Sequence, residues 1–207
     1  MRPFTEITAL ACRLAIDNID TDQLIPARFM RRPRSEGYGG FLLYDLRFDA
    51  DGAIKPDCPL NDLAVAGCEV LLARRNFGCG SSREAAVYAV ADFGIRVVVA
   101  SSFGDIFASN AIKNGIVPAR VSEEDAERLL NAGELVANRP MTVDLEKQTI
   151  AVGNLVVPFV IDPVWKKQLL NGWDDIDMTG SEAPAIARFT ERDARLRPWV
   201  KPAGIVS

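Results

Sequence analysis

The sequence predicts an α/β protein with one compact domain, and three observations carry that prediction. Residues 68–77, CEVLLARRNF, form an apolar run typical of a buried strand, and residues 95–101, IRVVVAS, form a second. Between them, residues 83–94 place apolar side chains at helical spacing and end in a glycine, a typical helix stop. A strand, a helix and a strand in this order predict parallel pairing with a right-handed crossover.

Before this unit, the sequence predicts a strand, a short helix and long loops. Residues 8–16, TALACRLAI, predict the first strand. Residues 18–30, NIDTDQLIPARFM, predict a turn that leads into a short helical segment with Pro26 near its start. Glycines and prolines between residues 31 and 59 predict long surface loops, which in a compact domain are usually functional or mobile.

After the unit, the sequence predicts further helices and a hairpin. Residues 103–115 predict a helix with a C-terminal glycine, residues 116–121 a short strand, and Ser122 the cap of the next helix. Alternating apolar and polar residues on either side of residues 146–148 predict an antiparallel hairpin. Residues 163–173 predict an amphipathic helix, and we expect the polar, proline-containing remainder to lie over the surface.

Composition argues against several classes of function. With 24 Lys and Arg against 28 Asp and Glu, the formal net charge of -4 argues against a nucleic-acid scaffold. No apolar run approaches the roughly 20 residues that cross a bilayer, and a signal peptide is not apparent, so we expect a cytoplasmic protein. The four cysteines form no CxxC pair, so neither a disulfide framework nor a closed metal site is expected. The chain has no histidine, which excludes a Ser-His-Asp triad or a Cys-His dyad within it.

The segment NFGCGSSREAAV, residues 76–87, joins a glycine-rich loop to the start of the central helix. Ser81 and Glu84 fit a capping box, which predicts that Ser81 caps this helix. Glycines on both sides of Cys79 let the backbone turn sharply, and a glycine-rich loop before a helix N-terminus binds anions. The lysine of a Walker loop and the GxGxxG pattern are both missing. A carboxylate fits better, because Arg83 offers a planar fork that can bind it in bidentate fashion.

Three segments of the chain resemble one protein family, the small subunits of 3-isopropylmalate dehydratase, which form the swivel domain of the aconitase superfamily. The segments are DNIDTDQLIPARF, LLARRNFGCGSSREAAVYAVADFGIRVVVASSFGDIF and NGWDDIDMTG. The resemblance runs from about Phe4 to Thr179, and the paired occurrence of DTDQLIP and NFGCGSSRE is highly specific. It implies a three-layer β/β/α swivel domain with a barrel-like mixed sheet over residues 1–180. Residues 181–207 would be an extension packed on that domain or trailing from it.

The resemblance implies one half of a heteromeric hydro-lyase of leucine biosynthesis. Such an enzyme interconverts 2-isopropylmalate and 3-isopropylmalate by dehydration to isopropylmaleate and rehydration. The implied partner is a large subunit whose [4Fe-4S] cluster binds the substrate hydroxyl and carboxylate, while the small subunit itself binds no cofactor. The absence of histidine and of cluster-type cysteine spacing agrees with this division.

The resemblance also implies roles for single residues. Ser81 matches the serine that, as an alkoxide, removes the proton from the carbon next to the leaving hydroxyl. Loop amides, the helix N-terminus and cations would have to stabilise that charge. Gly80, Ser82 and Arg83 match positions that bind a substrate carboxylate. Asp22 matches an active-site aspartate that orients catalytic groups; the alternative for it is an Asx-turn residue before a helix.

The basic loop ARFMRRPRSEGYGG, residues 27–40, receives a looser assignment. In relatives this region helps to contact the substrate, and Arg28, Arg32 or Arg34 can supply another carboxylate contact. Each of these arginines alone also fits a solvated surface cation. As a group they are expected to contribute, because a dicarboxylate needs more than one countercharge.

One residue departs from the family pattern, since the family continues SSREHA and Ala85 stands here in place of the histidine. The position lies in the first helical turn behind the proposed base. The change therefore alters support of that base, or marks a paralogous subunit acting on citraconate, 2-methylmalate or another substituted malate. Two other classes stay open: a non-catalytic carboxylate-binding domain, and a stand-alone serine hydrolase, which the missing histidine disfavours.

Overall fold

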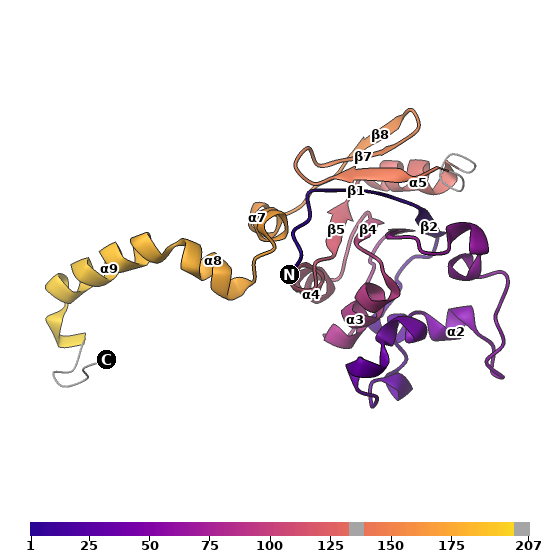
Figure 1. The fold of residues 1–207 in the computed structure, drawn as a ribbon, viewed down its shortest axis with the longest axis horizontal. Coiled ribbons are helices and arrows are strands. Elements are labelled where there is room, and N and C mark those ends of the chain that lie inside the picture. Colours follow the sequence, from indigo (N-terminus) through magenta and orange to yellow (C-terminus); the bar gives the residue numbers. More distant parts are fainter. Residues whose placement is uncertain (133–138, 201–207) are drawn as a thin grey trace. The chain divides into compact units, whose positions relative to one another are not determined.

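The computed structural model describes residues 1–132 and 139–200, and it divides the chain into two compact units, Met1–Gly172 and Trp173–Ser207. The first unit holds both β-sheets (Figure 1). The division falls before residue 180, where the resemblance places the end of the swivel domain. The relation of residues 181–207 to that domain stays a prediction, and residues 201–207 lie outside the described residues.

A parallel sheet forms the centre of the first unit. Its strands are β2 (Ala11–Leu14), β3 (Val70–Ala73), β4 (Val97–Ala100) and β5 (Val117–Arg120), in that spatial order. Every residue of β3 and β4 is buried, as expected of parallel strands that are covered on both faces. The helix α3 (Glu84–Phe93) connects these two strands, so the predicted strand-helix-strand unit is confirmed.

An antiparallel sheet forms the second layer. Its strands are β1 (Glu6–Ala9), β6 (Met141–Asp144), β7 (Thr149–Val152) and β8 (Leu155–Pro158), in the order β1-β6-β7-β8. The predicted hairpin is confirmed by the pairing of β7 with its neighbours on both sides.

The prediction of one strand over residues 8–16 is wrong. The chain leaves the antiparallel sheet after β1, and the carbonyl of Leu10 already accepts bonds from the amides of Glu69 and Val70 at the start of β3 (3.2 and 3.3 Å). A continuous apolar run hides this change of sheet, because both strands bury similar side chains. An isolated bridge between Arg120 and Val160 joins the end of β5 to the segment after β8.

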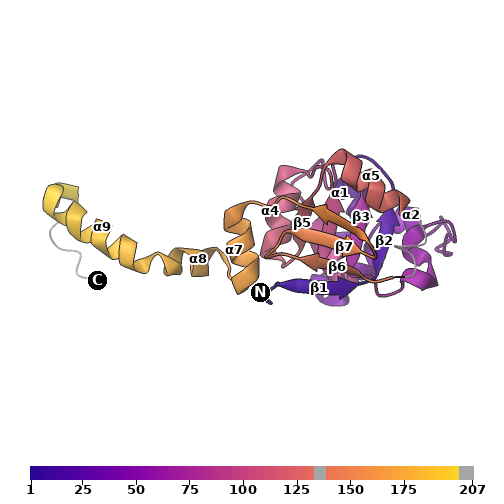
Figure 2. The ribbon, with the colours of Figure 1, turned by 90° about the horizontal axis from the view of Figure 1, so that it is seen from above.

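The side chains of the parallel strands alternate between two hydrophobic clusters, which gives the fold its layers. Val70 and Leu72 pack in the cluster that contains the antiparallel strands, whereas Leu71 and Ala73 pack in the cluster that contains α3. Figure 1 shows the antiparallel strands, the parallel strands and helices α3 and α4 as successive layers, and Figure 2 shows β6 and β7 lying over the parallel strands. The predicted β/β/α layering is confirmed, with the strands divided between two sheets.

The remaining helices vary in length. The α-helices are α1 (Thr21–Leu24), α2 (Tyr44–Arg47), α4 (Asp105–Lys113), α5 (Glu123–Asn131), α7 (Pro163–Asn171), α8 (Asp175–Ser181) and α9 (Ala183–Leu196), and the 3-10 helices are η1 (Ala27–Phe29), η2 (Arg34–Glu36), η3 (Tyr38–Phe41), η4 (Pro59–Asn61), η5 (Leu63–Val65) and η6 (Pro198–Val200). The predicted cap of α5 is confirmed, because the Ser122 hydroxyl accepts from the amide of Asp125 (3.0 Å). The sequence analysis did not predict the helices α8 and α9. In the described ranges, no helix is long and apolar enough to cross a membrane.

The segment predicted as a long surface loop is packed against α3. Tyr38 is buried, and its amide donates to a carboxylate oxygen of Asp92 near the end of α3 (3.2 Å). A Cβ atom at Gly39 would lie 2.5 Å from the carbonyl oxygen of Asp92, so the two backbones touch. The glycines and charged residues that predict a loop therefore also allow this segment to pack closely on α3. Composition alone does not predict this packing.

We expect Gly39→Ala to destabilise the protein, because the added methyl group meets backbone that has little room to move. Overpacking of this kind costs about 1–3 kcal/mol in the free energy of unfolding, measurable by denaturant unfolding. Gly40→Ala is the matched control, since nothing lies within 4 Å of a Cβ atom at that position. Equal unfolding free energies for the two variants would contradict the close packing of η3 on α3.

Candidate functional site

The serine loop, defined here as residues 76–83, connects β3 to α3 and has an unusual backbone. Asn76, Gly78 and Gly80 all have positive φ values of 59°, 72° and 94°. A Cβ atom at Gly78 would lie 2.2 Å from the ring of Phe107, so this position also lacks room for a side chain. The two glycines around Cys79 are thus required by backbone conformation, as the sequence predicts.

Hydrogen bonds hold the serine loop from two sides. On one side the amide of Gly78 donates to the carbonyl of Ile19 (2.7 Å), and the amide of Thr21 donates to the carbonyl of Cys79 (2.9 Å). On the other side the amide of Phe77 donates to the carbonyl of Ser102 (3.0 Å). The bridges between Asp20 and Cys79 and between Phe77 and Phe103 continue the parallel pairing past the ends of the strands.

The predicted capping box at the start of α3 is wrong. The helix begins at Glu84, and its cap residue is Arg83, whose side chain makes no capping hydrogen bond. The amide of Arg83 instead donates to the carbonyl of Ser81 (2.7 Å), which makes a tight turn and starts the helix later than the S-x-x-E pattern predicts. Among the residues that the structure describes, no side chain accepts a hydrogen bond from the first amides of α3.

Ser81 and Ser82 lie at the surface of the protein. Both residues are exposed, and neither hydroxyl has a hydrogen bond within the part of the chain that the structure describes. Two exposed hydroxyls next to an uncapped helix N-terminus form a surface suited to an anion.

Asp22 and Arg83 form an ion pair across the site. Nη1 of Arg83 donates to Oδ1 of Asp22, a residue within α1. The side chain of Asp22 is 54% exposed and that of Arg83 26% exposed. The residue that precedes and caps α1 is Asp20, not Asp22. The Asp20 carboxylate accepts from the amide of Gln23 (2.7 Å), and the Asp20 amide donates to the side-chain oxygen of Gln23 (2.9 Å). The structure therefore brings Asp22, Ser81 and Arg83 together.

The three arginines of the basic loop are each paired with an acidic side chain. The partners are Asp45 for Arg28, Glu36 for Arg32 (3.6 Å) and Asp92 for Arg34 (2.8 Å). Among the described residues, no hydrogen bond or ion pair joins any of the three to the serine loop.

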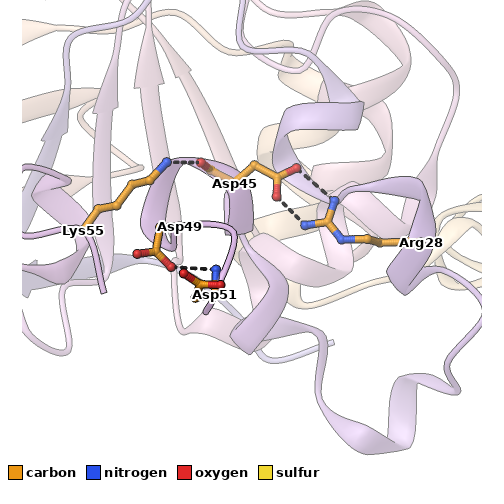
Figure 3. A network of polar contacts seen from close by, with 5 residues as sticks. All are labelled: Arg28, Asp45, Asp49, Asp51 and Lys55. Carbon is orange, nitrogen blue, oxygen red and sulfur yellow. Dashed lines mark hydrogen bonds and ion pairs between the residues drawn. The ribbon is translucent and has the colours of Figure 1, made fainter. Parts of the chain in front are cut away.

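The placement of Arg34 illustrates this separation. Asp92 lies near the end of α3, about 12 Å along the helix axis from Glu84 at 1.5 Å per residue. Figure 3 shows the Arg28 guanidinium facing the carboxylate of Asp45, which lowers the pKa of that carboxyl group mainly through the hydrogen bond. Figure 3 also shows Lys55 bonded to the Asp45 carbonyl (2.9 Å).

Thr21 contacts the site from α1, and the sequence does not predict this role. This residue is buried, and its hydroxyl donates to the carbonyl of Ser81 (3.1 Å). The sequence DTD predicts a turn, but it carries no signal for a contact sixty residues away. The unpredicted contact matters because it reaches the backbone of the proposed base.

Two clefts flank the serine loop, and neither is lined by its serines. One of about 230 Å³ is lined by Arg74, Arg75 and Ser101 with neighbouring residues, and the other, of about 630 Å³, by Ser102, Phe103 and residues beyond them. Neither Ser81 nor Ser82 lines either of these two clefts. Within residues 1–132 and 139–200, no group of three His, Cys, Asp or Glu side chains could hold a metal ion.

Comparison with known proteins identifies relatives that match most of the chain. Residues 1–124 match the family model of the aconitase C-terminal domain. Two relatives called 3-isopropylmalate dehydratase small subunit, from Afipia carboxidovorans and Rhodospirillum centenum, are each 44% identical to this chain. The alignments cover 97% and 96% of this chain, and 100% and 98% of the relatives, respectively. The crystal structure of a 3-isopropylmalate dehydratase chain from Methanocaldococcus jannaschii is 25% identical, with a TM-score of 0.62 over 88% of this chain and 98% of that one. The chain therefore belongs to the family of 3-isopropylmalate dehydratase small subunits, within the aconitase superfamily.

Proposed function

We propose that this chain supplies one half of the active site of a 3-isopropylmalate dehydratase, a hydro-lyase of leucine biosynthesis in the cytoplasm. Ser81, as an alkoxide, removes the proton from the carbon next to the one that carries the hydroxyl group. The hydroxyl group takes up a proton from a general acid and leaves as water. Addition of water in the other orientation, with the proton of Ser81 returned to carbon, gives the isomer. Serine is a weak acid, so its alkoxide requires strong local stabilisation.

The observation that carries this proposal is the uncapped N-terminus of α3 beside two serine hydroxyls that have no hydrogen-bond partner among the described residues. In most helices a side chain satisfies some of the first amides. Here the capping residue is Arg83, whose side chain makes no such bond to these amides. The helix dipole and the amides together favour negative charge at Ser81 or on a substrate carboxylate.

The ion pair of Asp22 and Arg83 supports a carboxylate site. The Asp22 carboxylate accepts from Nη1 of the guanidinium, and no described residue accepts from Nε or Nη2, so these two keep donors for a bidentate contact with a substrate carboxylate. We infer that Asp22 orients this fork, while Gly80 and Ser82 line the same anion site. Arg28, Arg32 and Arg34 can contact the substrate only if their present ion pairs break. Binding of the partner would have to break them.

The other half of the site belongs, in this proposal, to a large subunit with a [4Fe-4S] cluster. Such a cluster binds the substrate hydroxyl and carboxylate as a Lewis acid. Two observations support the division: the serines lie on open surface outside the neighbouring clefts, and the described residues offer no metal-binding group. The large subunit would close this open surface when the two chains associate.

The proposed substrate is isopropylmalate, and Ala85 is the reason to test a second one. Ala85 is partly buried and packs against the hydrophobic cluster beneath α3, so it presents no polar group near Ser81. A paralogous enzyme acting on citraconate or 2-methylmalate, which carry a smaller alkyl group, is the alternative.

We expect the purified chain alone to be inactive and to gain isomerase activity with the large subunit. Assays with isopropylmalate and citraconate side by side identify the substrate. In the complex, Ser81→Ala should lower kcat by about 10²–10⁴-fold, the contribution of a positioned general base. Ser122→Ala, which removes only the cap of α5, should leave kcat unchanged. Turnover by this chain alone, or full activity of the Ser81 variant, would contradict the proposal.

We expect Arg83→Lys to raise KM by about ten-fold, or ~1.4 kcal/mol, because lysine keeps the charge but cannot form the bidentate contact. The matched control is Arg75→Lys, since Arg75 forms a similar exposed pair with Asp17 (3.5 Å) away from the serines. An equal KM for both variants would show that the fork of Arg83 does not contact the substrate.

We expect Asp22→Asn to lower activity with little loss of stability. The Asp22 side chain is largely exposed, so the ion pair contributes at most about 1 kcal/mol to the free energy of unfolding. Thermal unfolding and kinetics of the same preparation separate the two effects. A large loss of stability with unchanged kinetics would make Asp22 a structural residue.

A further inference from the structure

We propose that Thr21 is a positioning residue, whose hydroxyl fixes the orientation of the Ser81–Ser82 peptide group and so aims the Ser82 amide at the anion site. This inference rests on the proposed function of the serine loop. It assigns Thr21 no contact with the substrate. Its effect is transmitted through the backbone of the proposed base.

The burial of Thr21 shows that its hydroxyl has a specific partner. Thr21 is 2% exposed, one of three polar or charged residues buried within the described ranges. A buried hydroxyl group costs free energy unless it is hydrogen-bonded, and this one donates to the carbonyl oxygen of Ser81 (3.1 Å).

The backbone holds Thr21 in place for this contact. Its amide donates to the carbonyl of Cys79 (2.9 Å), and Asp20 and Cys79 form a parallel bridge. A Cβ atom at Gly80 would lie 3.5 Å from the Thr21 hydroxyl, an ordinary van der Waals distance, so Gly80 and Thr21 are neighbours. Thr21 therefore contacts the loop backbone at Cys79, Gly80 and Ser81.

The geometry of a trans peptide converts this contact into an orientation. The Ser81 carbonyl accepts from the hydroxyl of Thr21 and from the amide of Arg83 (2.7 Å). In a planar trans peptide, the N–H group points opposite to the C=O group. The Ser82 N–H therefore points away from Thr21, and it has no acceptor among the described residues. A fixed, unpaired amide beside the base is a preorganised donor for developing negative charge.

Substitutions of Thr21 can distinguish the role of its hydroxyl group from the packing of its side chain. Valine has nearly the same shape and would fill the buried space, but it would leave the Ser81 carbonyl with only the bond from Arg83. The peptide group could then rotate and turn the Ser82 amide away. Serine keeps the hydroxyl and loses only a methyl group, so it should preserve the orientation.

The test compares Thr21→Val and Thr21→Ser in the complex of the full chain with the large subunit. We expect Thr21→Val to lower kcat by about ten-fold or more, as expected for a misplaced oxyanion donor, with KM changed by less than about three-fold. The rise of kcat with pH should move to higher pH in this variant, because the alkoxide loses stabilisation. Thr21→Ser should restore kcat to within about three-fold of the original.

Thr8→Val is the control, since it removes one hydroxyl of an exposed pair with Thr142 in the antiparallel sheet (2.9 Å). If Thr21→Val lowers the unfolding temperature, Thr21→Ala replaces it, because alanine adds no group to the buried site. Its kcat, KM and pH profile are then compared with those of Thr21→Ser. An unchanged kcat and pH profile in a folded Thr21→Val or Thr21→Ala variant would overturn the inference. An inactive original complex would instead overturn the proposed function, so the two failures are distinguishable.

Discussion

The parallel register of β2, β3 and β4 is the constraint on which the site depends. The pairing does not stop where the strands end: the bridges between Asp20 and Cys79 and between Phe77 and Phe103 carry it into the following loops. Loops that follow parallel strands meet at the carboxyl edge of the sheet, where ligands commonly bind in α/β folds. This register brings the DTDQ and GCGSSR segments side by side, although some sixty residues separate them.

The serine loop departs from ordinary helix-start chemistry, and that departure is informative. Ser81 stands where a capping serine would satisfy the first amides, yet the structure uses its carbonyl for a tight turn and leaves α3 uncapped. Natural proteins tend to break local rules at functional sites and to compensate elsewhere. Here the compensation comes from Thr21, from the amide of Gly78 and from the contacts of Phe77, which fix the loop without occupying its exposed face.

The sequence was sufficient for features set by periodicity and composition. The central strand-helix-strand unit, the hairpin and the cap at Ser122 follow from local patterns, and the glycines beside Cys79 follow from backbone sterics. Contacts between distant segments could not be predicted in this way. The ion pair of Arg34 with Asp92 and the hydrogen bond of Thr21 depend on which loop reaches which helix, and the change of sheet at Leu10 lies within one apolar run.

The central claim is that the amides at the start of α3 bind a dicarboxylate only when the large subunit closes the site. Amide hydrogen exchange at Glu84 and Ala85 tests it directly, measured in this chain alone and in the complex, each with and without an unreactive dicarboxylate analogue of isopropylmalate. The amide of Ala86 is the internal reference, because it already donates to the carbonyl of Arg83 (3.1 Å). We expect slower exchange at these two amides only when the large subunit and the analogue are both present. Unchanged exchange at these amides in an active complex that has bound the analogue would contradict it.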